Sequence, residues 1–280
     1  MLDYRILKAF HLGLVQDDQA RGMPDFIDPE PIVPPALAGM PALMPRLADL
    51  AGLDAGQAVA VLASLNQQVQ AGEAPWLAAL LRSDRPERVA RHLRSRLVID
   101  MAGTGPCFFR FFDPRVLVQL PWMLAPAQLA WLFGPVQAFH VCLHQAWHTV
   151  ERPAAEAAPH LALTPEQSFA LVHVQPMNEV LAGLEGLDID GRIRLGRAVI
   201  GHFRTARDLG LRTLPDRKAF ARHALAVHAD FYRHDQVQAC LRAMDDQDDH
   251  PYVAATQALD DEDWSRIHTD MSRTGEQHGR

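Results

Sequence analysis

One stretch of sequence, residues 107–117, constrains the fold of this chain more than any other. It reads Cys-Phe-Phe-Arg-Phe-Phe-Asp-Pro-Arg-Val-Leu and follows a segment with two glycines and a proline. A short aromatic run bounded by such residues is typical of a buried strand, here over 107–112. Asp113 then offers a side-chain oxygen to the free N–H groups of a helix start, and Pro114 occupies the first turn, where a missing N–H costs little. The stretch therefore predicts a strand that leads directly into a short helix.

Alternation along this predicted strand divides its side chains between two faces. We expect one face to belong to the core, and it holds Cys107, Phe109 and Phe111. The other face has two interpretations. In the first, Arg110 and Arg115 pair with Asp113 or with nearby carboxylates, and the residues are structural. In the second, arginine and aromatic side chains act as anchors for a protein partner. That partner-binding surface would consist of Phe108, Arg110, Phe112 and Arg115.

The same stretch resembles the signature of a known protein family. The order Phe-Arg-Phe-aromatic-Asp-Pro-Arg-Val-Leu, the helix start Leu-Ala-Pro-Ala-Gln-Leu and the ending Leu-Phe-Gly-Pro-Val are similar to those of the bacterial type VI secretion adaptors, also called effector chaperones. Looser similarity upstream extends the resemblance over most of residues 1–145. The chain departs from the pattern in two places. Phe112 stands where the family has tyrosine, and the glycine-rich segment 102–106 is longer than usual.

This resemblance implies an adaptor that binds other proteins and is not an enzyme. Such adaptors carry a domain that was first catalogued as one of unknown function, and they are encoded beside spike-protein and effector genes. They hold a toxic effector in the cytoplasm and help to load it onto the spike protein of the secretion machine. The resemblance therefore implies two partners, a cognate effector and the type VI spike protein, and no cofactor. It also implies that the variable C-terminal helices select the cargo.

Composition narrows the class of protein further. The formal net charge of the 280 residues is -7, which argues against a nucleic-acid partner, because phosphates require a basic surface. The three cysteines are widely spaced, odd in number and without a zinc-binding pattern, so we expect a reducing cytoplasm. The sequence shows neither a leader-like N-terminus nor an apolar run long enough to span a bilayer, and we expect no membrane association.

The pattern of apolar residues predicts two parts and the fold class α+β. Residues 1–150 are expected to form a mixed α/β adaptor domain, in which helices flank a small sheet. The segment 151–159 is rich in Ala, Glu and Pro and is typical of a linker. Residues 151–280 show helical spacing without strand alternation, which predicts an all-helical C-terminal lobe. Aspartates are frequent near its end, so this lobe carries an acidic tail, with Asp245, Asp246, Asp248, Asp249 and residues 260–263.

Individual elements follow from local signals. Asp54 with Gln57 three residues later predicts a capped helix that ends near Gly72. Thr164 before Pro165 predicts another helix start. The expected strands cover residues 76–81, 97–100, 107–112 and 136–143. The expected helices of the C-terminal lobe are one that begins at Thr164 and is kinked at Pro176, and two more over residues 193–209 and 215–244.

A basic helix is expected after Asp84, which with Glu87 resembles a second capping box. Its apolar stripe consists of Val89, Leu93 and Leu97, and five arginines cover the rest: Arg85, Arg88, Arg91, Arg94 and Arg96. In one interpretation these arginines are the solvated outer face of an amphipathic helix. In the other they form an electrostatic patch for an acidic protein partner, with Arg88 and Arg91 as its candidate residues.

Two alternatives to the adaptor remain open. His140, His144 and His148 stand four residues apart, and on a helix they would place three imidazoles on one face, as in a metal-dependent hydrolase. Residues 139–143 read equally well as a strand, which would separate the three. The other alternative is a structural helical interaction module. The sequence has no nucleophile turn and no phosphate-binding loop, so we predict no catalytic residue. It also has no His-Glu-x-x-His pattern, and a metal site needs further ligands and an ordered second shell, so we predict no metal ligand.

Overall fold

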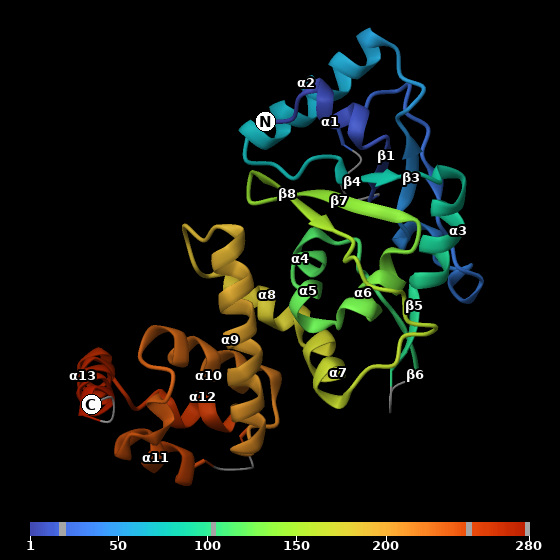
Figure 1. The fold of residues 1–280 in the computed structure, drawn as a ribbon. Helices are drawn as coiled ribbons and strands as arrows, with labels where there is room; N and C mark the ends of the chain where they lie inside the picture. Colours follow the sequence, from blue (N-terminus) through green and yellow to red (C-terminus); the bar gives the residue numbers. More distant parts are fainter. Residues whose placement is uncertain (17–20, 102–104, 245–247, 278–280) are drawn as a thin grey trace. The chain divides into compact units, whose positions relative to one another are not determined.

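The structure of the chain, a computed structural model, describes residues 1–16, 21–101, 105–244 and 248–277. It divides into two compact units, Met1–Val172 (unit 1) and His173–Arg280 (unit 2). Unit 1 is mixed α/β, and the described residues of unit 2 are helices and loops (Figure 1). The predicted fold class, α+β with a helical C-terminal lobe, is confirmed. The boundary lies after Val172, whereas the sequence suggested one after residue 150.

The described part of unit 1 contains one antiparallel sheet of six strands and a separate hairpin. The order of the six strands is β2-β3-β1-β4-β7-β8. The middle strands are apolar and buried, whereas the edge strands expose side chains, and both residues of β2 are exposed. The bounds are β1 Leu12–Val15, β2 Glu30–Pro31, β3 Arg46–Asp49, β4 Leu77–Ser83, β7 Val136–Leu143 and β8 Ala146–Glu151.

Helices α1 (Tyr4–Ala9) and α2 (Ala55–Gln70) cover one face of this sheet (Figure 1). The predicted capping box starts α2, because Asp54 accepts the N–H of Gln57 at 2.8 Å and the Gln57 side chain accepts the N–H of Asp54. The apolar stripe of α2 packs in one cluster with the side chains of β4. That cluster includes Val61, Leu65, Trp76, Leu77 and Leu80.

Short helices cover the other face. They are α4 (Pro114–Leu117), α5 (Leu120–Met123) and α6 (Pro126–Phe133). The ring of Phe133 meets the ring of Phe139 on β7 edge-on, with centroids 4.9 Å apart. Edge-to-face contact of this kind is favourable between aromatic rings. This contact holds α6 against β7, which also carries Gln137 of the candidate site described below.

The aromatic stretch folds differently from the predicted strand over 107–112. The hairpin consists of β5 (Val98–Met101) and β6 (Gly105–Phe108), and its connection, residues 102–104, lies outside the described residues. After Phe108 the chain turns, and the N–H of Asp113 donates to the carbonyl of Arg110 at 3.1 Å. The predicted division into two strand faces is therefore wrong. Phe109 and Phe111 are buried, as expected for the core face, but Phe112 of the other predicted face is buried as well, and Cys107 is only half-buried.

Helix α3 (Pro86–Arg96) follows β4 and buries Val89 and Leu93, as its apolar stripe predicted. The expected cap at Asp84 is wrong. The N-cap residue is Arg85, and no side chain caps this helix start. Asp84 instead accepts a hydrogen bond from the Gln137 side chain of β7.

Helix α7 (Pro165–Val172) begins at the predicted Thr164 cap and belongs to unit 1. The predicted kink at Pro176 is wrong, because α7 ends at Val172 and a new helix begins at Val174. The expected helix over 215–244 is also divided: His234 begins a new helix by accepting the N–H of Gln236. The helices of unit 2 are α8 Val174–Ala182, α9 Ile189–Asp208, α10 Leu214–Ala226, η4 Phe231–Arg233, α11 Asp235–Arg242, α12 Pro251–Thr256 and α13 Asp261–Gln277.

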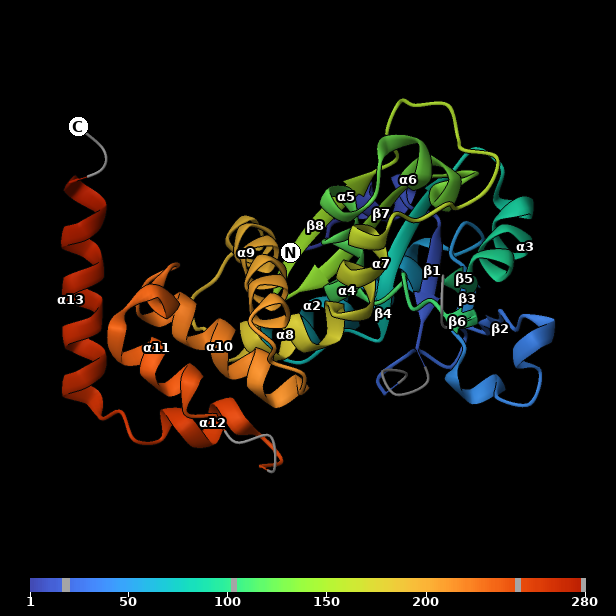
Figure 2. The ribbon, with the colours of Figure 1, turned by 90° about the horizontal axis from the view of Figure 1, so that it is seen from below.

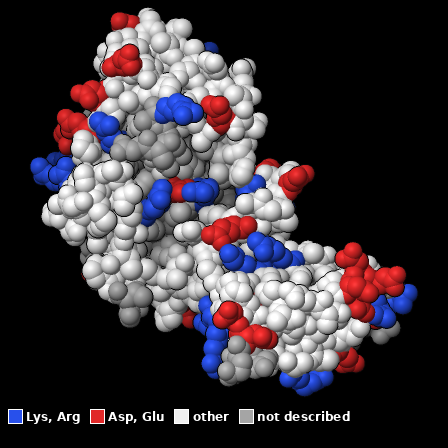
Figure 3. Space-filling view, turned by 180° about the vertical axis from the view of Figure 1, so that it is seen from behind, with Lys and Arg blue, Asp and Glu red and all other residues white. Residues whose placement is uncertain are grey.

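The core of unit 2 is an aromatic cluster around Phe220, Phe231 and Tyr252, joined by Ile267 of α13. Figure 2 shows α13 beside α11, and the Gln236 side chain donates to Asp263 across this contact. The predicted acidic tail is present at the start of α13, where acidic side chains gather in Figure 3. Asp245 and Asp246 of that prediction lie outside the described residues. Within the described ranges, no helix combines the length and apolarity needed to cross a membrane.

Candidate functional site

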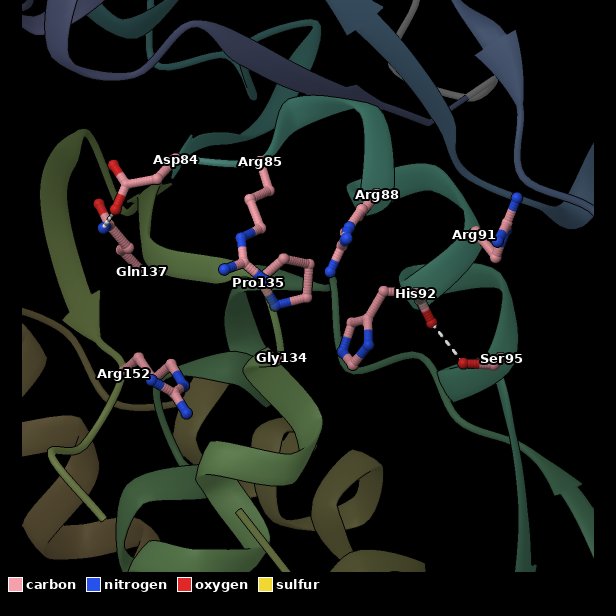
Figure 4. Close-up of a pocket in the computed structure, with 10 residues that line it drawn as sticks. All are labelled: Asp84, Arg85, Arg88, Arg91, His92, Ser95, Gly134, Pro135, Gln137 and Arg152. Carbon is pink, nitrogen blue, oxygen red and sulfur yellow. Dashed lines mark hydrogen bonds between the residues drawn. The ribbon is translucent and has the colours of Figure 1, made fainter. Parts of the chain in front are cut away.

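A hollow of about 830 Å³ opens on unit 1 between α3, the turn that precedes β7 and the chain that leaves β8 (Figure 4). We call it the arginine pocket. Its lining combines four arginines with one acidic residue. The described residues that line it are Asp84, Arg85, Arg88, Arg91, His92, Ser95, Gly134, Pro135, Gln137 and Arg152.

Helix α3 supplies the first wall. Successive residues of an α-helix are rotated by about 100°, so positions three apart lie on neighbouring turns and are offset by about 60° around the axis. Arg85, the N-cap residue, and Arg88 and Arg91 within the helix all line the pocket, and Figure 4 shows them in this order along α3. Their rise is about 9 Å from the first to the last. The cations therefore form a row.

The sheet supplies the opposite wall. Strands β7 and β8 pair directly, and the N–H of Arg152, just past β8, donates to the Gln137 carbonyl at 2.7 Å. The Arg152 side chain lies across the hollow from α3 in Figure 4. Gln137 also donates its side-chain amide to Asp84, the one acidic residue among the described lining residues. The pocket therefore combines four guanidinium groups with a single carboxylate among its described lining residues, which leaves an excess of positive charge.

The base of the pocket is His92 against the turn at Gly134. His92 Nε2 lies 2.8 Å from the carbonyl oxygen of Leu132, and a carbonyl only accepts, so we assign the proton to Nε2. Burial lowers the pKa of His92, although the Leu132 carbonyl opposes this effect. Ser95 donates its hydroxyl to the His92 carbonyl at 2.7 Å. The positive charge of the pocket therefore comes from the arginines.

These arginines are exposed, and their guanidinium groups are available to a ligand. An ion pair in this row joins Arg88 to Glu87 at 3.7 Å, with both side chains mostly exposed, and such a contact contributes little. Guanidinium groups match carboxylates and phosphates through paired hydrogen bonds. The arginine pocket therefore carries groups whose geometry matches anionic ligands.

The structure places the predicted partner-binding residues in two different locations. Arg88 and Arg91 lie in the arginine pocket. The other four are not among the residues that line it. Phe112 is 1% exposed and offers no surface to a partner in this conformation. Arg110 donates to Gln16 at 2.9 Å, and its guanidinium lies 5.8 Å from the centroid of the Phe112 ring. Phe108 is half-buried, with its ring 6.3 Å from that of Phe112.

The structural interpretation of Asp113 and Pro114 is confirmed. Asp113 accepts the N–H of Arg115 at 2.9 Å and begins α4, with Pro114 at the first position. The guanidinium of Arg115 pairs with the same carboxylate at 2.7 Å. Asp113 is 6% exposed. Arg115 therefore stabilises a buried cap, which is the pairing proposed in the structural interpretation.

The three histidines of the alternative prediction do not share a helix face. His140 lies on β7, His148 on β8, and His144 in the turn between them with φ 49°. His140 stacks on Trp147 and contacts Thr149 Oγ1 at 2.8 Å, and burial, together with nearby His148, lowers its pKa to about 4. Within the described residues, no group of three His, Cys, Asp or Glu side chains is placed to hold a metal ion.

Sequence reasoning missed the wall and base of the pocket opposite α3. The spacing of Arg85, Arg88 and Arg91 by three residues was a visible signal. Gly134 was visible only as a helix stop. Arg152 carried no local signal, because only the pairing of β4 with β7 and of β7 with β8 brings it near α3.

Comparison with known proteins gives one match. No curated protein and no solved structure matches the chain. A protein-family model described as "Domain of unknown function (DUF4123)" matches residues 34–131. This range includes α3 and the aromatic stretch, and it ends before Gly134, Gln137 and Arg152. The match with the DUF4123 family therefore lies within unit 1, over residues 34–131.

Proposed function

We propose that this chain is a non-enzymatic adaptor that holds a specific type VI secretion effector in the bacterial cytoplasm and helps to load it onto the spike protein. The observation that carries the proposal is the DUF4123 match over residues 34–131. The signature that resembles the type VI adaptors, from Phe108 to Leu117, lies inside this range. Both lines of reasoning therefore lead to the same part of the chain.

The arrangement of unit 1 supports a binding role. The aromatic residues of the signature are structural, because Phe111 and Phe112 are buried and Asp113 caps α4. These buried residues of the signature therefore build the fold, whereas its exposed side chains are Arg110 and Arg115. Exposed arginines are favoured residues at protein interfaces. The arginine pocket supplies four of them on one surface.

Co-expression tests this proposal. The full chain is produced together with the effector encoded beside it, and separately with the spike protein, and complexes are isolated through a tag on the partner. We expect a stable complex with the effector and a larger soluble fraction of the effector when the chain is present. An unrelated effector from another gene cluster is the control. Failure of the neighbouring effector and of the spike protein to associate with the chain would contradict the proposal.

A further inference from the structure

Four exposed arginines line one hollow of a chain whose formal net charge is -7. Like charges held together repel each other, so such a cluster is stabilised when an anion enters it. The acidic residue at its edge, Asp84, already accepts a hydrogen bond from Gln137. The arginine pocket is thus a solvent-exposed region of positive charge on a protein whose net charge is negative.

The layout of the charges indicates the kind of anion. The guanidinium row of α3 follows about 9 Å of helix, and Arg152 faces it from the other wall. The oxygens of one phosphate surround a single atom and cannot reach along such a row. An extended peptide advances about 3.3 Å per residue, so acidic residues two or three positions apart would meet successive arginines. A chain of carboxylates fits this layout better than a single phosphate group.

We infer that the arginine pocket binds an acidic segment of a partner protein, with its carboxylates paired to Arg85, Arg88 and Arg91 on one side and Arg152 on the other. This inference rests on the proposed function, because the segment would belong to the effector or the spike protein. It adds to that function the site and the chemistry of recognition. Guanidinium groups pair with carboxylates through two parallel hydrogen bonds, which fixes orientation as well as charge.

The probe is a fluorescein-labelled peptide of alternating glutamate and glycine, and the matched peptide has glutamine in place of glutamate. Binding to the full chain is followed by fluorescence anisotropy. We expect the glutamate peptide to bind and the glutamine peptide not to bind. Because exposed charges are screened over about 8 Å at physiological ionic strength, binding should weaken as NaCl is added.

Charge reversal locates the site. The variant Arg85→Glu/Arg88→Glu/Arg91→Glu should raise the Kd for the glutamate peptide about tenfold or more. Arg152→Glu tests the opposite wall independently and should weaken binding in the same direction. Arg94→Glu is the matched control, since Arg94 is exposed on the same helix but does not line the pocket. We expect its Kd to change less than about twofold.

Several outcomes would overturn the inference. The first is equal affinity for the glutamine and glutamate peptides. The second is an unchanged Kd for the glutamate peptide in both the triple variant and Arg152→Glu. The third is displacement of the labelled peptide by inorganic phosphate at a lower concentration than by the unlabelled glutamate peptide. The co-expression assay separates this result from the proposed function. If the triple variant still binds the effector and the spike protein as the wild type does, the adaptor role stands and the pocket assignment fails. If the wild type binds neither, the adaptor role fails, whatever the peptide does.

Discussion

The imidazole of His92 occupies the space that a side chain at position 134 would need. A Cβ atom built on Gly134 would lie 2.1 Å from Cε1 and 2.4 Å from Nε2 of His92. Gly134 also has φ 53°, in the left-handed region that favours glycine. This close approach lets His92 reach the Leu132 carbonyl and form the base of the arginine pocket.

Gly134→Ala should therefore lower the free energy of unfolding by about 2 to 4 kcal/mol, since the backbone conformation becomes strained and His92 must move. Urea unfolding followed by circular dichroism measures this change. Gly52→Ala is the matched control, because a Cβ atom at this position would meet nothing within 4 Å and the φ of Gly52 is not positive. It should be neutral or stabilising by up to about 1 kcal/mol. Equal stability of the two variants would contradict the geometric argument.

Variants at Asp113 and Arg115 separate the contribution of the helix cap to stability from that of the ion pair. Asp113→Ala removes both the bond to the Arg115 N–H and the ion pair with its guanidinium, and should cost about 1 to 2 kcal/mol. Asp113→Asn keeps a capping oxygen and should cost less. Arg115→Ala removes only the exposed partner and should cost less than about 1 kcal/mol. Chemical denaturation of the three variants measures the order. A loss in Arg115→Ala as large as that in Asp113→Ala would show that the ion pair, and not the cap, dominates.

His223 makes the stability of unit 2 depend on pH. Its Nδ1 lies 2.7 Å from the Tyr252 hydroxyl and its ring packs on Trp264. Burial, with a smaller effect from Arg222, lowers the pKa of His223 to about 4. The unfolded chain, with an ordinary histidine pKa near 6.5, binds the proton first as the solution is acidified. The free energy of unfolding should therefore fall between about pH 6.5 and pH 4, by roughly 1 to 2 kcal/mol at about pH 5.

The measurement is urea unfolding at a series of pH values. His223→Gln should be less stable at neutral pH, and its stability should depend less steeply on pH across this range, because the titrating group is gone. His250→Gln changes an exposed histidine of the same unit and should keep the wild-type slope. A wild-type slope in His223→Gln would show that other groups cause the acid sensitivity.

Helix caps and apolar runs in the sequence correctly predicted those elements whose formation depends only on neighbouring residues. The caps at Asp54, Asp113 and Thr164 are present, because each requires only a side-chain oxygen within three residues of a free N–H. The strand over 136–143 was also predicted, from its apolar run, and it corresponds to β7. Such features are decided within a few residues of sequence.

Features that depend on distant residues were not predictable in the same way. The aromatic stretch alternates as a strand would, but the turn after Phe108 brings Phe112 into contact with Phe111, and burial of both rings outweighs local β preference. Arg152 reaches the pocket only through the pairing of β7 with β8. The sequence therefore predicted Arg88 and Arg91, in the wall of the candidate site that α3 forms. It did not predict the wall that the sheet forms.

The two-residue strand β2 has a consequence for the behaviour of the protein at high concentration. It ends one side of the sheet, and its second residue, Pro31, has no backbone N–H to donate. An exposed edge strand has unpaired N–H and C=O groups, with which strands of other molecules can pair and begin aggregation. Proline at this margin, with Pro29 and Pro34 close by in the sequence, removes donors that such pairing would need. The proline-rich segment thus disfavours strand pairing with other molecules at this edge of the sheet.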